Sequence, residues 1–139
     1  MIAQVLRVFS VGLIGMTMAT SASAFSTRDG ARVNQVNDVV FEVIGRSTAS
    51  SAQQFWCAAS EYARRALNAG WTDRVYLVQG RGQSVTTNRR SAVQFTMSPQ
   101  AAGITPIENN SVRLNSLKPG ESMSVQQANL YCSAIPDRF

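Results

Sequence analysis

The sequence predicts a small α+β domain in which an antiparallel sheet packs against one main helix, at about residues 51–69. Three observations predict this class. Short segments rich in β-branched and aromatic residues recur along the chain, one longer segment carries an apolar stripe with helical spacing, and the links between them are short and polar. A short C-terminal helix and one disulfide complete the predicted architecture.

Residues 1–24 have the features of a secretory signal peptide. Arg7 supplies a positive charge, an apolar run follows it, and Ala22 and Ala24 form a small-x-small cleavage site. A membrane-spanning helix needs about 20 apolar residues, and polar residues interrupt this run earlier. We therefore expect cleavage between Ala24 and Phe25, a periplasmic or secreted protein, and no transmembrane segment in the mature chain.

Removing 24 of the 139 residues leaves 115, which suits one domain with one modest core. We expect residues 25–32 to be a flexible mature N-terminus and residues 33–139 to form the domain. Without Arg7, 12 basic residues face 8 acidic ones, a net charge of +4, and all but one of the 12 are arginine. This balance favours anionic partners, with simple solubility as the alternative.

The first strand and the main helix have clear local signals. Residues 39–44, VVFEVI, predict a strand because they are rich in β-branched residues. A helix should follow and end at Gly70. Two serine–glutamine pairs fit its capping box: Ser50 with Gln53, and Ser51 with Gln54. The apolar stripe is typical of a helix packed on a core, and it comprises Phe55, Ala59, Tyr62 and Ala66, flanked by Trp56, Ala63 and Leu67.

Residues 74–80 and 90–97 predict the two strands of a hairpin, joined by a polar loop of eight to ten residues. Three arginines should meet at this loop: Arg81, Arg89 and Arg90. Glycines in the same loop would allow a ligand to approach the backbone closely. Because arginine forks suit carboxylate and phosphate groups, the loop is a candidate anion-binding site, with a solvated loop as the alternative.

The last third of the chain is less regular. Residues 98–103 predict a helical turn that begins with proline, and residues 111–117 predict a strand. Residues 122–134 are ambiguous. Ser124 with Gln127 fits a capping box, which favours a short C-terminal helix over a final strand.

The chain has two cysteines, Cys57 and Cys132, and we expect them to form a disulfide. A catalytic thiol needs an activating base such as histidine, and the sequence has no histidine. Two cysteines in an exported chain have one possible intramolecular pairing. Because Cys57 points about 160° from the apolar stripe, the bridge should hold the C-terminal segment on the outer flank of the helix, with Tyr131 or Leu130 resting on it.

The missing residues exclude several kinds of chemistry. The lack of histidine excludes Ser-His-Asp and Cys-His catalysis and zinc sites built on histidine, and two cysteines cannot form a four-thiolate metal site. The carboxylates are scattered singly, although two could still meet in space. We therefore predict no catalytic residue, no metal and no cofactor. Nucleic acid is not expected, because export removes most such partners and no aromatic-basic platform is present.

The segments VFEVIG, FWCAASEYARRAL, RVYLVQG, NRRSAVQFTMSP and SMSVQQANLYC together resemble a group of short, uncharacterised exported proteins from alphaproteobacteria. The resemblance covers residues 33–132 and depends on the Trp-Cys start of the helix, the NRRSAVQFT strand and the late Tyr-Cys pair. It implies a Gram-negative export signal. It implies no activity, so no functional residue is carried over.

We expect a non-enzymatic exported envelope protein, a small disulfide-closed binding or structural domain whose basic loop meets an anionic envelope component or protein. The alternative is an inhibitor of a secreted hydrolase, and a carboxylate-based enzyme is the third possibility. A binding module needs an open basic surface, an inhibitor needs a protruding rigid loop, and an enzyme needs a cleft with two converging carboxylates.

Overall fold

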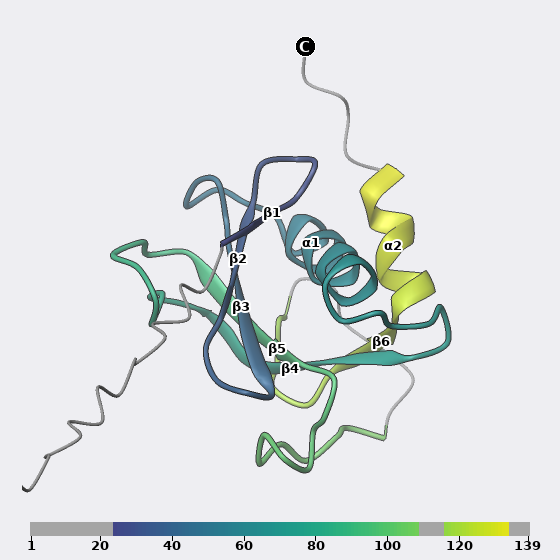
Figure 1. The fold of residues 1–139 in the computed structure, drawn as a ribbon. Helices are drawn as coiled ribbons and strands as arrows, with labels where there is room; N and C mark the ends of the chain where they lie inside the picture. Colours follow the sequence, from purple (N-terminus) through teal and green to yellow (C-terminus); the bar gives the residue numbers. More distant parts are fainter. Residues whose placement is uncertain (1–23, 109–115, 134–139) are drawn as a thin grey trace, which may run out of the picture.

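The computed structural model describes residues 24–108 and 116–133. It confirms the predicted α+β class, with one main helix and one short C-terminal helix against an antiparallel sheet (Figure 1). The elements in chain order are β1 (Phe25–Ser26), β2 (Arg32–Gln35), β3 (Val40–Ile44), α1 (Ala52–Arg65), β4 (Arg74–Gly82), β5 (Ala92–Thr96), β6 (Ser122–Ser124) and α2 (Val125–Ser133).

In the described ranges, six strands form one sheet in the order β1-β2-β3-β5-β4-β6, and each neighbouring pair is antiparallel. The predicted hairpin is confirmed as β4 and β5, joined by residues 83–91. In the central strand β3, Phe41 and Val43 belong to the core cluster, and the residue between them, Glu42, points to the opposite face by strand alternation. That opposite face positions the candidate site described below.

Helix α1 begins as one of the two predicted capping boxes requires. The Ser51 hydroxyl accepts a hydrogen bond from the Gln54 backbone N–H, and the Gln54 side chain accepts one from the Ser51 N–H. The helix ends at Arg65, so the predicted end at Gly70 is wrong. Asn68 adopts a left-handed conformation with φ of 53°, which asparagine tolerates better than most residues, and this turns the chain before Gly70 is reached.

The apolar stripe of α1 packs onto the sheet, as predicted for most of its members. Phe55 and Trp56 are fully buried, and the Trp56 ring meets the Phe95 ring edge-on with centroids 5.1 Å apart. The stripe stops where the helix stops. Ala66 and Leu67 are exposed, Leu67 by 44%, because they follow the last helical turn.

The predicted disulfide is confirmed: Cys57 and Cys132 are bridged, with their Cα atoms 4.9 Å apart. The bridge holds α2 alongside α1, on the side away from β1 to β3, so the sheet and α2 cover different flanks of α1 (Figure 1). The Ser124 hydroxyl accepts a hydrogen bond from the Gln127 N–H, as the predicted cap requires. Tyr131 and Leu130 are the two residues expected to rest on the main helix. Tyr131 packs against the core, whereas Leu130 is 64% exposed.

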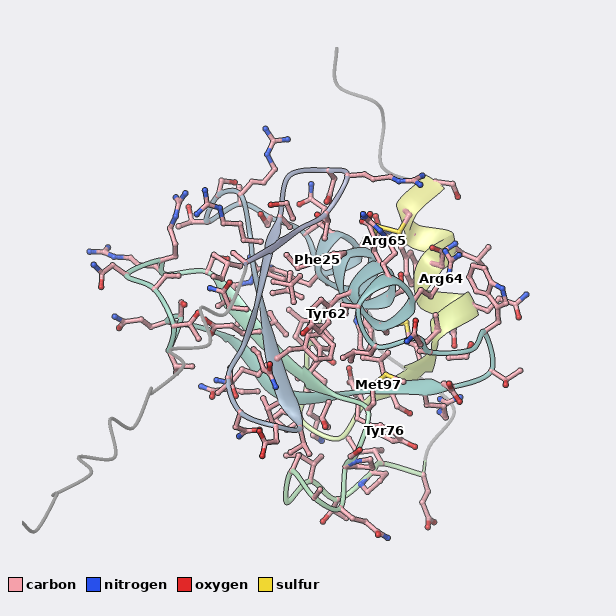
Figure 2. All side chains as sticks on the ribbon, in the orientation of Figure 1. Phe25, Tyr62, Arg64, Arg65, Tyr76 and Met97 are labelled. Atoms are coloured by element: carbon pink, nitrogen blue, oxygen red, sulfur yellow. A yellow bond between two sulfur atoms is a disulfide. The ribbon has the colours of Figure 1, made fainter. Side chains whose placement is uncertain are left out.

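The segment at residues 25–32 differs from the flexible N-terminus that we expected. Phe25 pairs with Val33 across β1 and β2, and Thr27 is buried in a hydrogen-bonded turn. The Phe25 ring also meets the Tyr62 ring edge-on, with centroids 5.3 Å apart (Figure 2). Aromatic burial and strand pairing therefore fix this segment to the domain.

Two other predictions concern the loops. Residues 98–103 form the expected turn, in which the Ile104 N–H donates to the Pro99 carbonyl over 2.9 Å. The strand predicted at 111–117 lies outside the described residues, apart from Ser116 and Leu117, which are not in a strand. Across the described parts of the chain, no helix combines the length and the apolar character needed to cross a bilayer.

Candidate anion-binding site

The loop between β4 and β5, residues 83–91, folds onto a buried carboxylate. Glu42 is fully buried on the sheet face opposite α1. Its carboxylate accepts hydrogen bonds from the Ser84 hydroxyl at 2.5 Å, from the backbone N–H groups of Val85 and Thr86 at 3.1 and 3.0 Å, and from the Thr86 hydroxyl. One strand residue thus anchors three consecutive loop residues.

Glu42 forms no ion pair with any described residue. Burial opposes its ionisation and by itself raises the pKa of the carboxyl group. The hydrogen bonds from Ser84, Thr86 and Val85 stabilise the charged form and outweigh burial, so the pKa lies below its ordinary value. Glu42 therefore holds the loop as an ionised acceptor at neutral pH.

The anchored loop fixes the backbone of Arg89. The Arg89 N–H donates to the Thr87 hydroxyl over 3.1 Å, and the Arg89 carbonyl accepts from the Ser84 N–H over 2.9 Å. The Ser84 hydroxyl in turn accepts from the Thr87 N–H and contacts Glu42. The position of Arg89 is therefore set, through Ser84, by the buried carboxylate.

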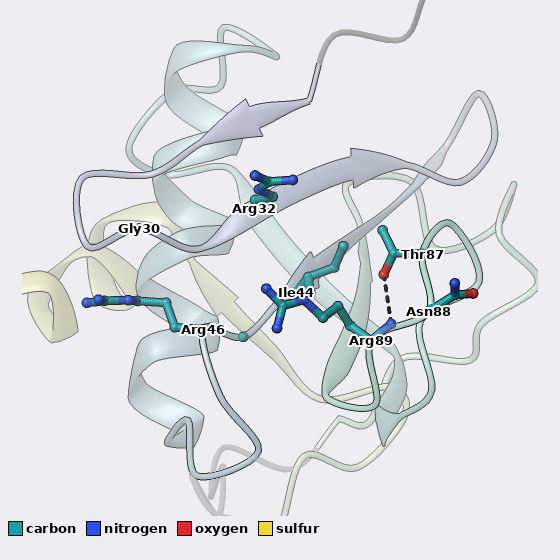
Figure 3. A pocket seen from close by; sticks show the side chains of 8 residues that line it. Gly30, Arg32, Ile44, Arg46, Thr87, Asn88 and Arg89 are labelled. Carbon is teal, nitrogen blue, oxygen red and sulfur yellow. Dashed lines mark hydrogen bonds between the residues drawn. The ribbon is translucent and has the colours of Figure 1, made fainter.

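Beside this loop lies a groove of about 260 Å³, which we call the arginine groove (Figure 3). Three arginines from three segments line it: Arg32 from β2, Arg46 from the residues after β3, and Arg89 from the loop. The Arg89 side chain extends across Ile44 toward the part of the groove between the other two (Figure 3). The full lining comprises Gly30, Arg32, Ile44, Gly45, Arg46, Thr87, Asn88 and Arg89.

The turn before β2 holds Arg46 in place. One guanidinium nitrogen of Arg46 donates to the Asp29 carbonyl over 3.2 Å, and the side chain lies against Gly30. Gly30 has φ of +87°, and a Cβ there would lie 3.2 Å from the Arg46 Cδ. Glycine therefore serves both the turn conformation and the close approach of the arginine.

The groove arginines have no carboxylate partner in the described residues. The two ion pairs of those residues both use Glu61, which contacts Arg28 and Arg65. Neither pair involves an arginine of the groove. Arginine presents donors in a planar fork that matches carboxylate, phosphate and sulfate oxygens, so the groove can hold an anionic group.

Of the three arginines that are expected to meet at the loop, one lines the groove and two do not. Arg89 lines the groove, but Arg81 does not. Its guanidinium donates to the Thr48 carbonyl over 3.3 Å and lies 5.1 Å from the centre of the Phe55 ring, at the start of α1. Arg90 is exposed and does not line the groove either.

Sequence reasoning missed Arg32 and Arg46. They meet because Arg32 lies opposite Ile44 in the β2–β3 ladder, and Arg46 follows Ile44 by two residues. These two arginines could have been found by treating residues 32–35 and 41–44 as an antiparallel hairpin. In such a hairpin the start of the first strand lies beside the end of the second. The sequence does not predict that pairing, because the first strand is expected at 39–44 and no strand is expected at 32–35.

Other kinds of site receive no support from the described residues. Within 24–108 and 116–133, no group of three or more Asp, Glu, Cys or His side chains is arranged to hold a metal.

No family model, curated protein or solved structure matches this chain.

Proposed function

We propose that this chain is an exported, non-enzymatic binding domain that holds an anionic group in the arginine groove. One observation carries the proposal: three guanidinium groups from three separate segments surround one groove and have no ion-pair partner among the described residues. Positive side chains usually disperse or pair with carboxylates, so an unpaired cluster around a concave surface favours an anionic ligand.

Preorganisation supports the proposal. The Asp29 carbonyl and Gly30 hold Arg46, and the hydrogen bonds around Ser84 hold the backbone of Arg89. Because one guanidinium and the backbone beneath another are already held, less conformational freedom is lost when a ligand binds, which favours affinity.

Location and chemistry point the same way. The Cys57–Cys132 bridge supports an oxidising compartment, where disulfides persist, and the N-terminal pattern predicts export. The chain has no histidine. The buried carboxylate nearest the loop, Glu42, is fully covered and uses its oxygens to anchor the loop, so it is not placed to act as an acid or base on a ligand. These features favour binding over catalysis.

The test is a charge-matched pair of variants, measured by calorimetry with sulfate, phosphate and galacturonate as probes. Arg32→Gln/Arg46→Gln/Arg89→Gln removes the groove cations. We expect at least about a tenfold loss of affinity, since hydrogen bonds to charged groups contribute about 1.5–3 kcal/mol each in good geometry.

The control, Arg64→Gln/Arg65→Gln/Arg74→Gln, removes the same charge elsewhere. Arg64 and Arg65 belong to the last turn of α1 (Figure 2), where the Arg65 guanidinium lies over the Phe25 ring, and Arg74 donates to Ser122 in β6. We expect this variant to bind within about twofold of the parent. Equal losses in both variants would show that net charge, and not the groove, attracts the anion, and unchanged binding in the groove variant would place the site elsewhere.

A further inference from the structure

We propose that the ligand is an acidic polysaccharide that lies across one whole end of the domain, with the arginine groove as one contact along it. This inference rests on the proposed anion-binding function and extends it from a single group to a polymer. Three observations support it: strand register brings several arginines to one end of the sheet, these arginines are exposed, and the segments that carry them contain no aromatic residue.

Strand register brings three connections to the same end of the sheet. Arg32 lies opposite Ile44, Ile44 lies opposite Ala92, and Ala92 lies opposite Gly82. The chain segments that leave the sheet there are residues 27–32, 45–51 and 81–91, which we call the basic end.

The basic end carries most of the positive charge. Its three segments contain one aspartate, Asp29, and six arginines, a net charge of +5. The other described residues carry four basic and six acidic side chains, a net charge of −2. The domain is therefore strongly dipolar. The arginines are Arg28, Arg32, Arg46, Arg81, Arg89 and Arg90.

Two carboxylates from other segments, Glu61 and Glu42, lie close to the basic end, but its net charge stays positive. Glu61 contacts Arg28 and so offsets part of that charge, and Glu42 is buried beneath the loop. All six arginines of the basic end are exposed. Several cations distributed over a surface suit a ligand with repeated anionic groups, because each added contact is intramolecular once the first is made.

The side chains that accompany these arginines favour a glycan over other polyanions. None of the three segments contains an aromatic residue, so bases of a single-stranded nucleic acid would find no stacking platform. The Phe55 ring, over which the Arg81 guanidinium lies, is buried. Among the exposed large apolar residues in the described part of the chain, Val85 alone belongs to the basic end. A helix or loop that inserts into a bilayer presents an apolar face.

The remaining side chains of the basic end suit the hydroxyl groups of a sugar chain. Serine, threonine, asparagine and glutamine occupy many of the positions between the arginines, among them Thr48, Gln83, Thr87 and Asn88. Their hydroxyl and amide groups donate and accept hydrogen bonds. A uronic-acid polymer offers the matching combination of carboxylates and hydroxyls.

The test compares oligogalacturonates of one, three and about ten units by calorimetry at two salt concentrations. We expect the affinity per molecule to rise at least about tenfold from the monomer to the longest chain, and to fall steeply with salt. Arg28→Gln/Arg90→Gln, which leaves the groove intact, should weaken the long chain several-fold and leave the monomer unchanged. The groove triple variant should weaken both.

Each other outcome counts against the inference. If monomer and polymer bind equally well and only the groove variant loses binding, the groove takes a single anion, and the polymer inference fails while the proposed function stands. If oligothymidylate or vesicles of anionic phospholipid bind more tightly than the longest oligogalacturonate, the partner belongs to another class. If no anionic probe binds, the inference and the proposed function fail together.

Discussion

Replacing both cysteines with alanine is expected to lower the free energy of unfolding by about 4.5 kcal/mol, because the Cys57–Cys132 bridge closes a loop with a sequence separation of 75. This figure comes from the chain-entropy model and is an upper value, because native-state strain and residual structure in the unfolded chain reduce the effect. A domain of this size has a net stability of roughly 5–15 kcal/mol, so the loss is a large share of the total. Alanine is chosen because Cys57 is 96% buried and serine would bury an unpaired hydroxyl.

Equilibrium unfolding in urea, at fixed pH and without reductant, measures this effect. The loss should appear as a lower midpoint, and the parent protein unfolded with a reductant should match the double variant. Amide exchange should rise first in α2, which the bridge holds alongside α1. A double variant as stable as the oxidised parent would show that core packing alone holds α2 in place.

Glu42→Gln is expected to lower the free energy of unfolding by about 2–4 kcal/mol, because it replaces an ionised acceptor beneath three donor residues of the loop. One oxygen remains as an acceptor, and the new amide group is itself a donor that faces other donors. The same change should weaken anion binding in the arginine groove, because Ser84 connects Glu42 to the backbone of Arg89.

The pH dependence has a defined sign. Hydrogen bonds hold the pKa of Glu42 below its ordinary value of 4.5. The ionised group therefore stabilises the fold above that pH, and the contribution is lost as pH falls through the lower pKa of the folded state. The stability difference between parent and Glu42→Gln should be full at pH 7 and should shrink below about pH 4.5.

The matched control is Glu108→Gln, which removes the same charge from an exposed position. We expect it to change stability by less than about 0.5 kcal/mol. If Glu42→Gln and Glu108→Gln gave the same stability and the same pH profile, the buried carboxylate would not be the anchor of the loop.

Features set by neighbouring residues could be predicted from the sequence. The cap of α1 needs Ser51 and Gln54, which lie three residues apart, and the hairpin needs two β-rich segments with a polar link. The disulfide was predictable because two cysteines allow one pairing, and the flank on which α2 lies followed from the direction of Cys57 on its helix.

Features set by pairing between distant segments could not be predicted in the same way. Residues 39–44 predict a strand that contains Glu42, but nothing local shows that residues 84–86 fold over this carboxylate. The groove depends on the β2–β3 register, which brings Arg32 close to Arg46. Arg81 is drawn away from Arg89 by contacts with Thr48 and Phe55, which are distant in sequence. The early end of α1 depends on backbone geometry at one asparagine, where composition favoured a glycine two residues later.

The central claim is that anions bind at the arginine groove, and a nuclear magnetic resonance titration tests it most directly. ¹⁵N-labelled protein is titrated with trigalacturonate, and both backbone amide and arginine Nε signals are followed. We expect the changes to gather at residues 28–32, 45–47 and 84–90, with the Nε signals of Arg32, Arg46 and Arg89 among the largest. Changes centred on residues 64–74 and α2, or no saturable change at the groove, would contradict the claim.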